Sequence, residues 1–499
     1  MRGLAKSSTT NERVRNPNSI FTSEEIIDIL TPVVGKTFGE IVLDDPDFWN
    51  TKNKGVAGHV IEKYVLGYNL NNDPDPDIEI DGVAVEVKTT GMRMVKNRFV
   101  AKEPVSITGV FIDKIVKEKE FEQSHLWKKA RQLLFVYYFY DYNGPYNVQE
   151  YKRFIIEGYE LKVISDEDKV ILESDWTTVR DFIIEADKTE RPNEIYPDIS
   201  HLQLMYMDTA PKYLEVDGKV KQSPRFRFKR AYVDGFIQEH FYGSKQVRLP
   251  FQFSKYAELD EKCLQLTNKY KGMTVWELLH NLQIFTKSIH KSISERIVLR
   301  MFDSNAQKIN DISIFNKLGL VGKTLVQSTN NSRTEDMKLF KIDFDEIRNP
   351  DLEFEDSQFY SYFKENQMLT ILFQEQTKKD VKFEDNRFVG FKRISFGEEF
   401  IEREVRPVWM EIRRLVNDKE LKEVFEYNKD GTIRMTPKTN VPVSAPNFPK
   451  SDEHLIFVRG SGVDKSQLPQ EINGIKMLTQ YLWIRGKEMN EVMNGQMSF

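Results

Sequence analysis

The sequence contains very little cysteine and no long apolar run. Cys263 is the one cysteine among 499 residues, which excludes a disulfide framework and a cysteine-rich zinc module and is typical of a reducing compartment. No stretch approaches the ~20 apolar residues that a membrane-spanning helix needs, and the polar N-terminus lacks the apolar core of a secretory signal. We therefore expect a cytoplasmic protein without membrane contact, in which residues 1–20 form a flexible leader.

The chain also lacks a strong excess of charge of either sign. Its 72 Lys and Arg against 77 Asp and Glu give a formal net charge of -5. Apolar residues make up 40%, with 34 Phe and 20 Tyr, which is too much for a disordered chain, and the length suggests several domains. Near-neutral charge does not exclude nucleic acid, because binding depends on where the positive charges lie.

Short similarities recur in the same order along the two halves of the chain. Six such pairs are separated by 233 to 253 residues, an offset that drifts only by loop-sized amounts. The pairs begin at Gly35 and Gly272, Val87 and Gly322, Phe121 and Phe354, Tyr151 and Phe391, Trp176 and Trp409, and His201 and His454. We therefore predict two copies of one domain, at residues 21–243 and 256–499, joined by a linker at residues 244–255.

Each copy shows mixed helical and strand patterning, which predicts a mixed α/β fold. Apolar residues at helical spacing predict a helix over residues 55–66. Residues 77–90 read as two strands around Asp81-Gly82, a dipeptide that supplies the positive φ angles of a tight hairpin turn. Residues 124–133 look helical and precede a very apolar run, residues 134–140, which we predict to be a buried central strand.

The chemically informative residues lie on the predicted hairpin. Glu86 and Lys88 are two residues apart on one strand, so their side chains leave the same face, and Asp77 can lie beside them across the turn. Converging carboxylates suit Mg²⁺, and an adjacent ammonium can position a water for attack on a phosphodiester. Glu62 adds another acid on the preceding helix. The alternative interpretation is a solvated strand face with a surface glutamate nearby.

Three motifs carry a family resemblance. They are Gly58-x-x-x-Glu62, Pro76-Asp77 and Glu86-Val-Lys88, and they resemble the MutH family of the PD-(D/E)xK nuclease superfamily. The duplicated length resembles its two-domain type II restriction endonucleases that cut GATC, the Sau-type enzymes. This resemblance implies two tandem restriction-endonuclease-like domains, each with a central mixed sheet flanked by helices.

The resemblance also implies roles for the site residues. It implies two Mg²⁺ ligands, Asp77 and Glu86, a lysine that assists the attacking water, Lys88, and an additional helix acid, Glu62. On the helix that follows the hairpin, Lys128 or Lys129 could approach the scissile phosphate, and a plain surface pair of lysines is an equal alternative.

The hairpin departs from the family spacing. Asp77 and Glu86 are nine residues apart, where the family has about seven. A symmetric lengthening would keep the facing pairs aligned, but Glu79 and Asp75 remain rival ligands.

The second copy lacks this chemistry. Alignment of Lys323 with Lys88 places Val321 where the first copy has its central glutamate. Arg296 falls near the position of the helix acid. A site without its central carboxylate should not hold Mg²⁺, so we predict that the second domain is catalytically silent. The resemblance implies that it serves as a DNA-binding, effector-like domain.

Positive charge is concentrated in residues 219–230. This segment holds six basic residues in twelve and no acid, and its arginines alternate with Phe226 and Phe228, which predicts one basic strand face. The predicted DNA contacts in this segment are Arg225, Arg227, Lys229 and Arg230. The resemblance implies further contacts from loops, by Lys212 in the first copy and by Arg459 and Lys465 in the second. The alternative is a solvated edge strand.

Together these observations predict a Mg²⁺-dependent type II restriction endonuclease that cuts double-stranded DNA and leaves 5′-phosphates. GATC as the recognition site and a cognate DNA methyltransferase in the same restriction-modification system are implied by the resemblance. One active site per chain must cut two strands, so we expect two chains to come together on DNA. The alternatives are a MutH-like mismatch-repair endonuclease that only nicks, and a non-catalytic DNA-binding protein.

Overall fold

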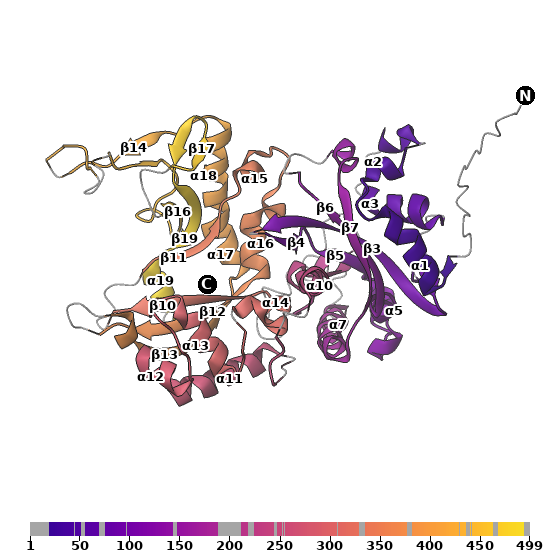
Figure 1. Ribbon diagram of the computed structural model, residues 1–499, viewed down its shortest axis with the longest axis horizontal. Helices are drawn as coiled ribbons and strands as arrows, with labels where there is room; N and C mark the ends of the chain where they lie inside the picture. Colours follow the sequence, from indigo (N-terminus) through magenta and orange to yellow (C-terminus); the bar gives the residue numbers. More distant parts are fainter. Residues whose placement is uncertain are drawn as a thin grey trace, which may run out of the picture. The chain divides into compact units, whose positions relative to one another are not determined.

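The computed structural model describes most of the chain. The described residues are 19–43, 45–50, 55–68, 75–95, 97–142, 147–187, 211–217, 224–243, 247–251, 253, 255–306, 308–328, 335–376, 382–428, 430–435, 440, 442–462 and 468–493. They form a mixed α/β fold in which several sheets are flanked by helices, as the sequence predicts (Figure 1). No helix in this part of the chain combines the length and apolarity needed to span a bilayer.

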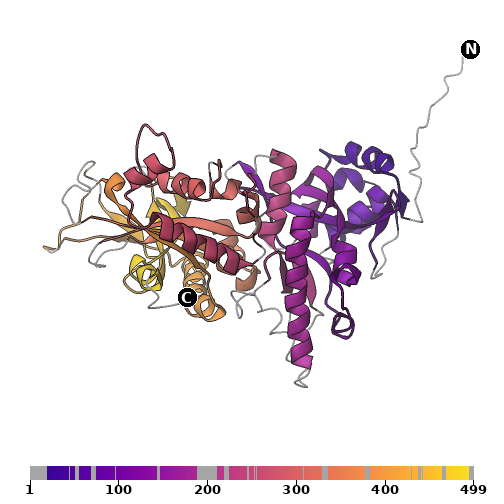
Figure 2. The same cartoon turned by 90° about the horizontal axis from the view of Figure 1, so that it is seen from below.

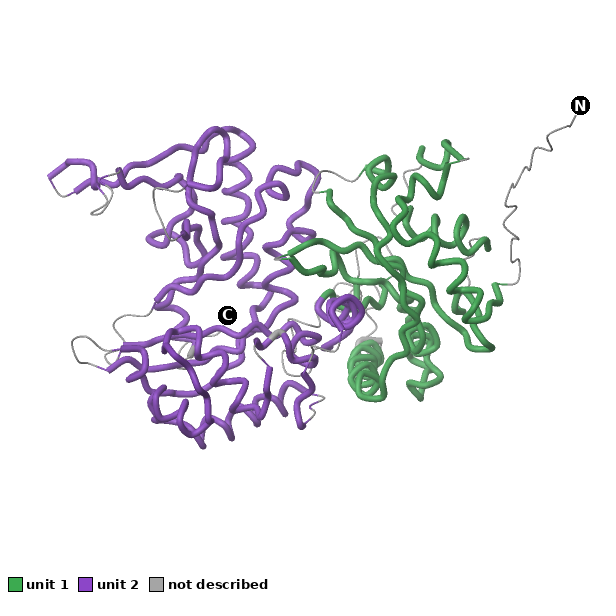
Figure 3. The backbone as a smooth tube through the Cα atoms, viewed as in Figure 1, with its two compact units in different colours: residues 1–142, 147–192, 216–230 green, residues 143–146, 193–215, 231–499 purple. Residues whose placement is uncertain are grey.

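The chain divides into two compact units (Figure 3). Unit 1 comprises Met1–Tyr142, Asn147–Pro192 and Val216–Arg230, and unit 2 comprises Asn143–Tyr146, Asn193–Glu215 and Ala231–Phe499. Within unit 2, the segment that the sequence predicts to be a linker forms specific contacts. Val247 pairs with Ile312 in an isolated β-bridge, and Phe253 is buried.

Unit 1 is built on a six-stranded mixed sheet with the order β1-β2-β3-β6-β7 and with β4 added to β3 (Figure 1). These strands are β1 (Ile20–Phe21), β2 (Ile78–Ile80), β3 (Val83–Val95), β4 (Arg98–Ala101), β6 (Gln132–Phe139) and β7 (Ile155–Val163). β3 and β6 are parallel, whereas β2 with β3 and β6 with β7 are antiparallel. Residues 133–138 of β6 are all buried, which confirms the predicted central strand.

The helices of unit 1 are short, with one exception. They are α1 (Ser23–Leu30), η1 (Thr31–Val33), α2 (Phe38–Ile41), η2 (Pro46–Asn50), α3 (Val56–His59), η3 (Val60–Leu66), α4 (Ile112–Ile115), η4 (Phe121–Gln123), α5 (His125–Ala130), α6 (Val148–Tyr151) and α7 (Asp166–Asp187). α7 has 22 residues and is the long helix of Figure 2. The predicted helix over residues 55–66 is present, but from Val60 onward it is a π-helix.

The predicted hairpin turn is also present. Asp81 and Gly82 join β2 to β3 with φ angles of 50° and 78°. Positive φ at both central residues is what a tight two-residue hairpin turn requires, and Asp-Gly supplies it at little cost.

A separate sheet carries the basic segment. Its order is β5-β9-β8, with β5 (Val105–Gly109), β9 (Arg225–Phe228) and β8 (Leu214–Asp217). β9 therefore lies between two strands and is not an edge strand. This arrangement excludes the solvated-edge interpretation of residues 225–228.

Unit 2 contains four small sheets. Their strands are β10 (Leu320–Gln327), β12 (Gln367–Gln374) and β13 (Arg387–Ile394) in the first, β11 (Met337–Lys341), β19 (Thr479–Ile484) and β16 (Ile456–Ser461) in the second, β14 (Glu423–Phe425) and β15 (Ser444–Pro446) in the third, and β17 (Gln470–Ile472) and β18 (Ile475–Met477) in the fourth.

Helices surround these sheets. They are α10 (Arg230–Tyr242), α11 (Tyr256–Tyr270), α12 (Val275–Asn281), α13 (Ile293–Met301), η5 (Ile309–Asp311), α14 (Ser313–Lys317), α15 (Phe344–Arg348), η6 (Phe354–Asp356), α16 (Gln358–Glu365), η7 (Phe383–Asp385), α17 (Glu398–Phe400), η8 (Ile401–Val405), α18 (Arg406–Asn417) and α19 (Gly486–Met493).

The sheet β10-β12-β13 has the strand arrangement of β3-β6-β7. In each sheet the first pair is parallel and the second is antiparallel. In both parallel pairs, each residue lies opposite the residue 47 positions later in the sequence. Glu86 pairs with Leu133, and Val321 pairs with Met368. The bulge in the antiparallel pair follows Tyr137 in one sheet and Leu372 in the other, 235 residues apart. The same offset places Val321 at the strand position of Glu86.

The turns before these sheets also correspond. Gly35 and Gly272 have left-handed φ angles of 83° and 85°. Their N–H groups donate to the carbonyls of Ile156 in β7 and Phe388 in β13, at 2.7 and 2.8 Å. Two residues later, a threonine begins a short helix with a capping box in each unit. The Gly-x-Thr similarity thus encodes a helix start in both units.

One predicted pair of the repeat is wrong. The sequence aligns Tyr151 with Phe391, but Tyr151 ends α6, whereas Phe391 lies inside β13. The β-bridges from the capping threonines pair instead with Ile155 in one unit and Arg387 in the other. A Lys-Arg dipeptide after each aromatic residue produced the false match, because charge alone does not distinguish a helix end from a strand.

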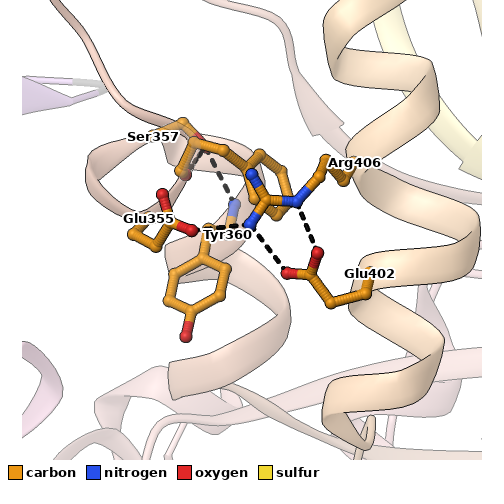
Figure 4. A network of polar contacts seen from close by, with 6 residues as sticks. Glu355, Ser357, Tyr360, Glu402 and Arg406 are labelled. Carbon is orange, nitrogen blue, oxygen red and sulfur yellow. Dashed lines mark hydrogen bonds and ion pairs between the residues drawn. The ribbon is translucent and has the colours of Figure 1, made fainter. Parts of the chain in front are cut away.

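A polar network joins η6 and α16 to the following helix in unit 2 (Figure 4). Arg406 donates from Nε to Glu402 Oε2 at 2.5 Å and from Nη2 to Glu355 Oε1 at 2.6 Å. Ser357 caps α16 by accepting from the N–H of Tyr360 at 3.1 Å. The Arg406 guanidinium thus links α18 to η6, through a contact between residues that are 51 positions apart in the sequence.

Candidate active site

Asp77 lies opposite Glu86 at the end of the hairpin ladder. Ile78 pairs with Val85, and continuing that register by one residue places Asp77 across from Glu86. Asp77 Oδ2 accepts a hydrogen bond from the N–H of Val87 at 2.9 Å, which fixes its carboxylate against β3. The longer hairpin therefore keeps these two positions aligned in spite of their nine-residue separation.

The rival ligands lie differently. Glu79 and Asp75 are exposed, whereas Asp77 is half-buried. Burial and the nearby charge of Glu86 raise the pKa of Asp77 above its usual value. Asp77 is thus the candidate that shares an electrostatic environment with Glu86.

Glu86 is a buried carboxylate held by two lysines. It is 2% exposed, and its Oε1 lies 2.7 Å from Lys88 Nζ. Its Oε2 lies 3.0 Å from the Nζ of Lys129, which is itself 8% exposed. A buried carboxylate requires such partners, because an unpaired charge in the interior is very costly. Lys128, the alternative that the sequence left open, is exposed.

Helix α5 holds Lys129 in position. Ser124 caps it by accepting from the N–H of Trp127 at 3.0 Å. Glu118 accepts from the backbone N–H of His125 at 2.9 Å, and its carboxylate also contacts the His125 ring. The first turn of α5 is therefore fixed by two side-chain acceptors, which satisfy N–H groups that a helix start leaves unpaired.

Glu62 is the third acid of the cluster, on η3. Burial and the charges of Asp77 and Glu86 raise the pKa of Glu62 to about 7, although Lys88 and Lys129 partly oppose this. α3 packs on β3 here, since a Cβ at Gly58 would lie 3.7 Å from Thr89 Oγ1. Three carboxylates thus share one partly buried region.

These residues fit a divalent cation, although they do not form a closed cage. Among the described residues, no three Asp, Glu, His or Cys side chains are grouped closely enough to enclose an ion. Mg²⁺ commonly takes one or two carboxylates and completes its shell with water and phosphate oxygens. Asp77 and Glu86 meet that requirement. Burial, and after it the neighbouring carboxylates, raise the pKa values of Asp77 and Glu62, and a cation would relieve the repulsion between these carboxylates.

We predict that Glu62→Gln stabilises the metal-free protein at high pH. The folded-state pKa of Glu62 is raised from 4.5 to about 7, so stability falls as pH rises through this window and the loss is complete above it. Removing the ionisable group should therefore raise the free energy of unfolding at pH 8 by ~1–3 kcal/mol and change it little at pH 4.5. Urea denaturation in EDTA at both pH values measures this.

The exposed acid Glu79 provides the control for this prediction. Glu79→Gln should change the free energy of unfolding by less than ~0.5 kcal/mol, as surface substitutions usually do. Equal stability of Glu62→Gln and wild type at pH 8 would contradict the proposed burial of charge at Glu62.

The equivalent positions of unit 2 carry different chemistry. Val321 replaces the central glutamate, and Lys323 donates to the backbone carbonyls of Lys338 and Leu339 at 2.7 and 3.3 Å. Tyr362 lies five residues after the cap of α16, as Lys129 does after the cap of α5. Arg296 lies on α13.

The basic strand of unit 1 is only partly as predicted. Phe226 and Phe228 are buried while Arg225 is exposed, which confirms the alternation. Arg227 forms an ion pair with Asp217 at 3.1 Å. β9 ends at residue 228, and the Lys229 side chain is 4% exposed, so it does not extend the basic face.

The other predicted DNA contacts lie in unit 2 or at its boundary. Arg230 begins α10 and is half-buried. Lys212 is 3% exposed, and its ammonium lies 5.8 Å from the centre of the Tyr256 ring. Arg459 contacts Asp336 at 2.6 Å and lies over the Trp483 ring. Lys465 lies outside the described residues.

One residue of this region was not anticipated from the sequence. Tyr68 follows the left-handed Gly67 that ends η3, and its side chain is 5% exposed. Its hydroxyl is buried and has no hydrogen-bond partner in the part of the chain that the structure describes. The sequence offers one signal for Tyr68, the glycine before it. A glycine after an apolar helix predicts where the helix ends, but it does not predict the direction of the next side chain.

Comparison with protein families gives one match. Residues 66–175 match the family model described as DNA mismatch repair enzyme MutH. No curated protein matches the chain. The matched segment includes Asp77, Glu86, Lys88 and Lys129, and the match supports a MutH-like domain with a restriction-endonuclease-like fold in unit 1.

Proposed function

We propose that this protein is a type II restriction endonuclease whose active site is formed by Asp77, Glu86, Lys88, Lys129 and Glu62. The observation that supports this most is the buried Glu86 carboxylate, which lies opposite Asp77 and contacts two lysines. A buried charged cluster of this kind adds little to stability and is typical of functional sites. Its position inside the MutH-like segment supports DNA as the substrate class.

The proposed chemistry is hydrolysis of a phosphodiester. Asp77 and Glu86 would hold a divalent ion, expected to be Mg²⁺, which supplies charge neutralisation at the scissile phosphate. Lys88 would position the attacking water and Lys129 would contact the phosphate. The water oxygen bonds to phosphorus as the bond from phosphorus to O3′ breaks, and a proton moves to the leaving oxygen. The products are a 3′-hydroxyl and a 5′-phosphate.

Unit 2 is proposed to bind DNA without cutting it. The shared strand register supports a second domain of the same kind, and Val321 and Tyr362 remove the two charges nearest its centre. On this view each chain contributes one cutting centre, so cleavage of both strands needs two chains on the DNA. The exposed Arg225 is the strongest candidate for a backbone contact from unit 1.

Recognition of GATC, and protection of the host by a cognate DNA methyltransferase, complete the proposal. Both rest on the resemblance to Sau-type enzymes.

Incubation of the purified protein with supercoiled plasmid and Mg²⁺ tests the function. A type II enzyme should give linear DNA without other proteins, and sequencing of the ends should show one recurring site with 5′-phosphates. Accumulation of nicked circles alone would favour a MutH-like nicking enzyme. Intact plasmid with DNA bound would favour a non-catalytic DNA-binding protein.

A further inference from the structure

Tyr68 lies beside the carboxylate cluster and is fixed by its backbone. Its N–H donates to the carbonyl of Glu62 at 3.2 Å, across the end of η3. Gly67, with a φ angle of 77°, makes the left-handed turn that permits this bond. The ring packs in the apolar core of unit 1. The side chain is therefore held close to the helix that carries Glu62.

The hydroxyl of Tyr68 is unusual because it is buried and unpaired. It has no hydrogen-bond partner among the described residues. Buried tyrosine hydroxyls generally have a partner, since leaving a polar group unpaired in the interior costs stability. An unpaired donor at a fixed place is a feature that a structural role does not explain.

Three carboxylates lie near enough to act on the charge of this phenol. Burial raises the pKa of Tyr68, and the next contributions come from the negative charges of Glu62, Asp77 and Glu86. The phenol therefore stays protonated at every physiological pH, as a neutral donor among three carboxylates. Glu62 is the strongest of the three charges acting on it.

We propose that Tyr68 is a positioning residue of the active site, whose hydroxyl donates a hydrogen bond to the Glu62 carboxylate when the site is loaded. This inference rests on the proposed function and extends it. A carboxylate that faces a metal ion with one oxygen is oriented by a hydrogen bond to the other, and such supporting bonds commonly tune metal affinity. Tyr68 would thus turn Glu62 toward Asp77 and Glu86.

Unit 2 supplies a matched comparison. The hydroxyl of Tyr362 is also buried, and no described residue forms a hydrogen bond with it. Burial alone raises the pKa of Tyr362, with no contribution from a carboxylate. Tyr362 therefore shares the unpaired hydroxyl of Tyr68 but not its acidic surroundings.

The test compares Tyr68→Phe with Tyr362→Phe in the full-length protein. Tyr68→Phe removes only the unpaired hydroxyl, so the metal-free Tm should equal or exceed that of wild type. Its apparent affinity for Mg²⁺, from the rise of Tm with Mg²⁺ in the absence of DNA, should fall about 10-fold, and cleavage should need correspondingly more Mg²⁺. Tyr362→Phe should leave both measurements unchanged.

Two outcomes would overturn the inference. One is a wild-type response of Tyr68→Phe to Mg²⁺ in both measurements. The other is a metal-free Tm below wild type, because it would mean that the hydroxyl already has a stabilising partner. Loss of cutting in Glu86→Ala together with a normal Tyr68→Phe would reject only the role of Tyr68. Normal cutting in Glu86→Ala would reject the proposed function itself.

Discussion

Glu86→Ala should reduce DNA cleavage by at least about 10³-fold while leaving binding to cognate DNA in Ca²⁺ largely intact. Glu86 is the one fully buried carboxylate of the site, and it contacts both lysines. Its removal takes away a ligand of the divalent ion and the group that orients Lys88 and Lys129. Single-turnover cleavage of a short duplex, and binding of the same duplex by gel shift, measure the two effects separately.

The fold must be controlled in this experiment. Removing one member of a buried ion pair typically costs ~3–5 kcal/mol, because the remaining charge is left unpaired. Glu86→Gln keeps the shape and can still accept from the lysines, so it separates loss of the ligand from loss of stability. Val321→Ala, at the same strand position in unit 2, should retain cleavage. Wild-type cutting by a folded Glu86→Gln protein would remove Glu86 from the active site.

Lys129→Ala should lower the cleavage rate by about 10²- to 10³-fold, whereas Lys128→Ala should change it by less than about 3-fold. The two lysines are adjacent, but Lys129 is 8% exposed and contacts Glu86, whereas Lys128 is exposed. A fixed ammonium in a buried site stabilises developing phosphate charge far better than a solvated one. Single-turnover rates at saturating protein provide the measurement.

The adjacent pair makes this comparison specific. Both substitutions remove one positive charge from α5, so any general loss of attraction for DNA should be equal in the two variants. Lys129→Ala leaves Glu86 with Lys88 as a partner, and the fold should therefore survive. Equal effects at both positions would mean that the lysines contribute only general charge.

The hairpin and the central strand could be predicted from the sequence because their signals are local. Asp81-Gly82 demands positive φ angles, and the run from Leu133 to Tyr138 is apolar enough to require burial on both faces. The relation between Glu86 and Lys88 follows from strand alternation alone. These features need no knowledge of distant parts of the chain.

The rest of the site depends on contacts between distant segments. The choice between Lys128 and Lys129 is set by the phase of α5, which Glu118 and Ser124 fix through caps that no local pattern reveals. Likewise, Lys229 looks like a continuation of the basic face, but its strand ends one residue earlier and tertiary packing buries it. Side-chain burial of this kind follows from three-dimensional packing and not from spacing.

The identical register of the two parallel strand pairs has a consequence for how the chain acquires its fold. β3 can in principle align with β12 as well as with β6, since the hydrogen-bonding pattern is the same. During translation, roughly 90 residues separate the end of β9 from the start of β10, and at ~5–20 residues per second the ribosome needs about 5 to 20 seconds to make them. The sheet of β3, β6 and β7 can therefore form before β12 has been synthesised. Refolding from denaturant removes this delay, so mispaired sheets should form there and not during biosynthesis.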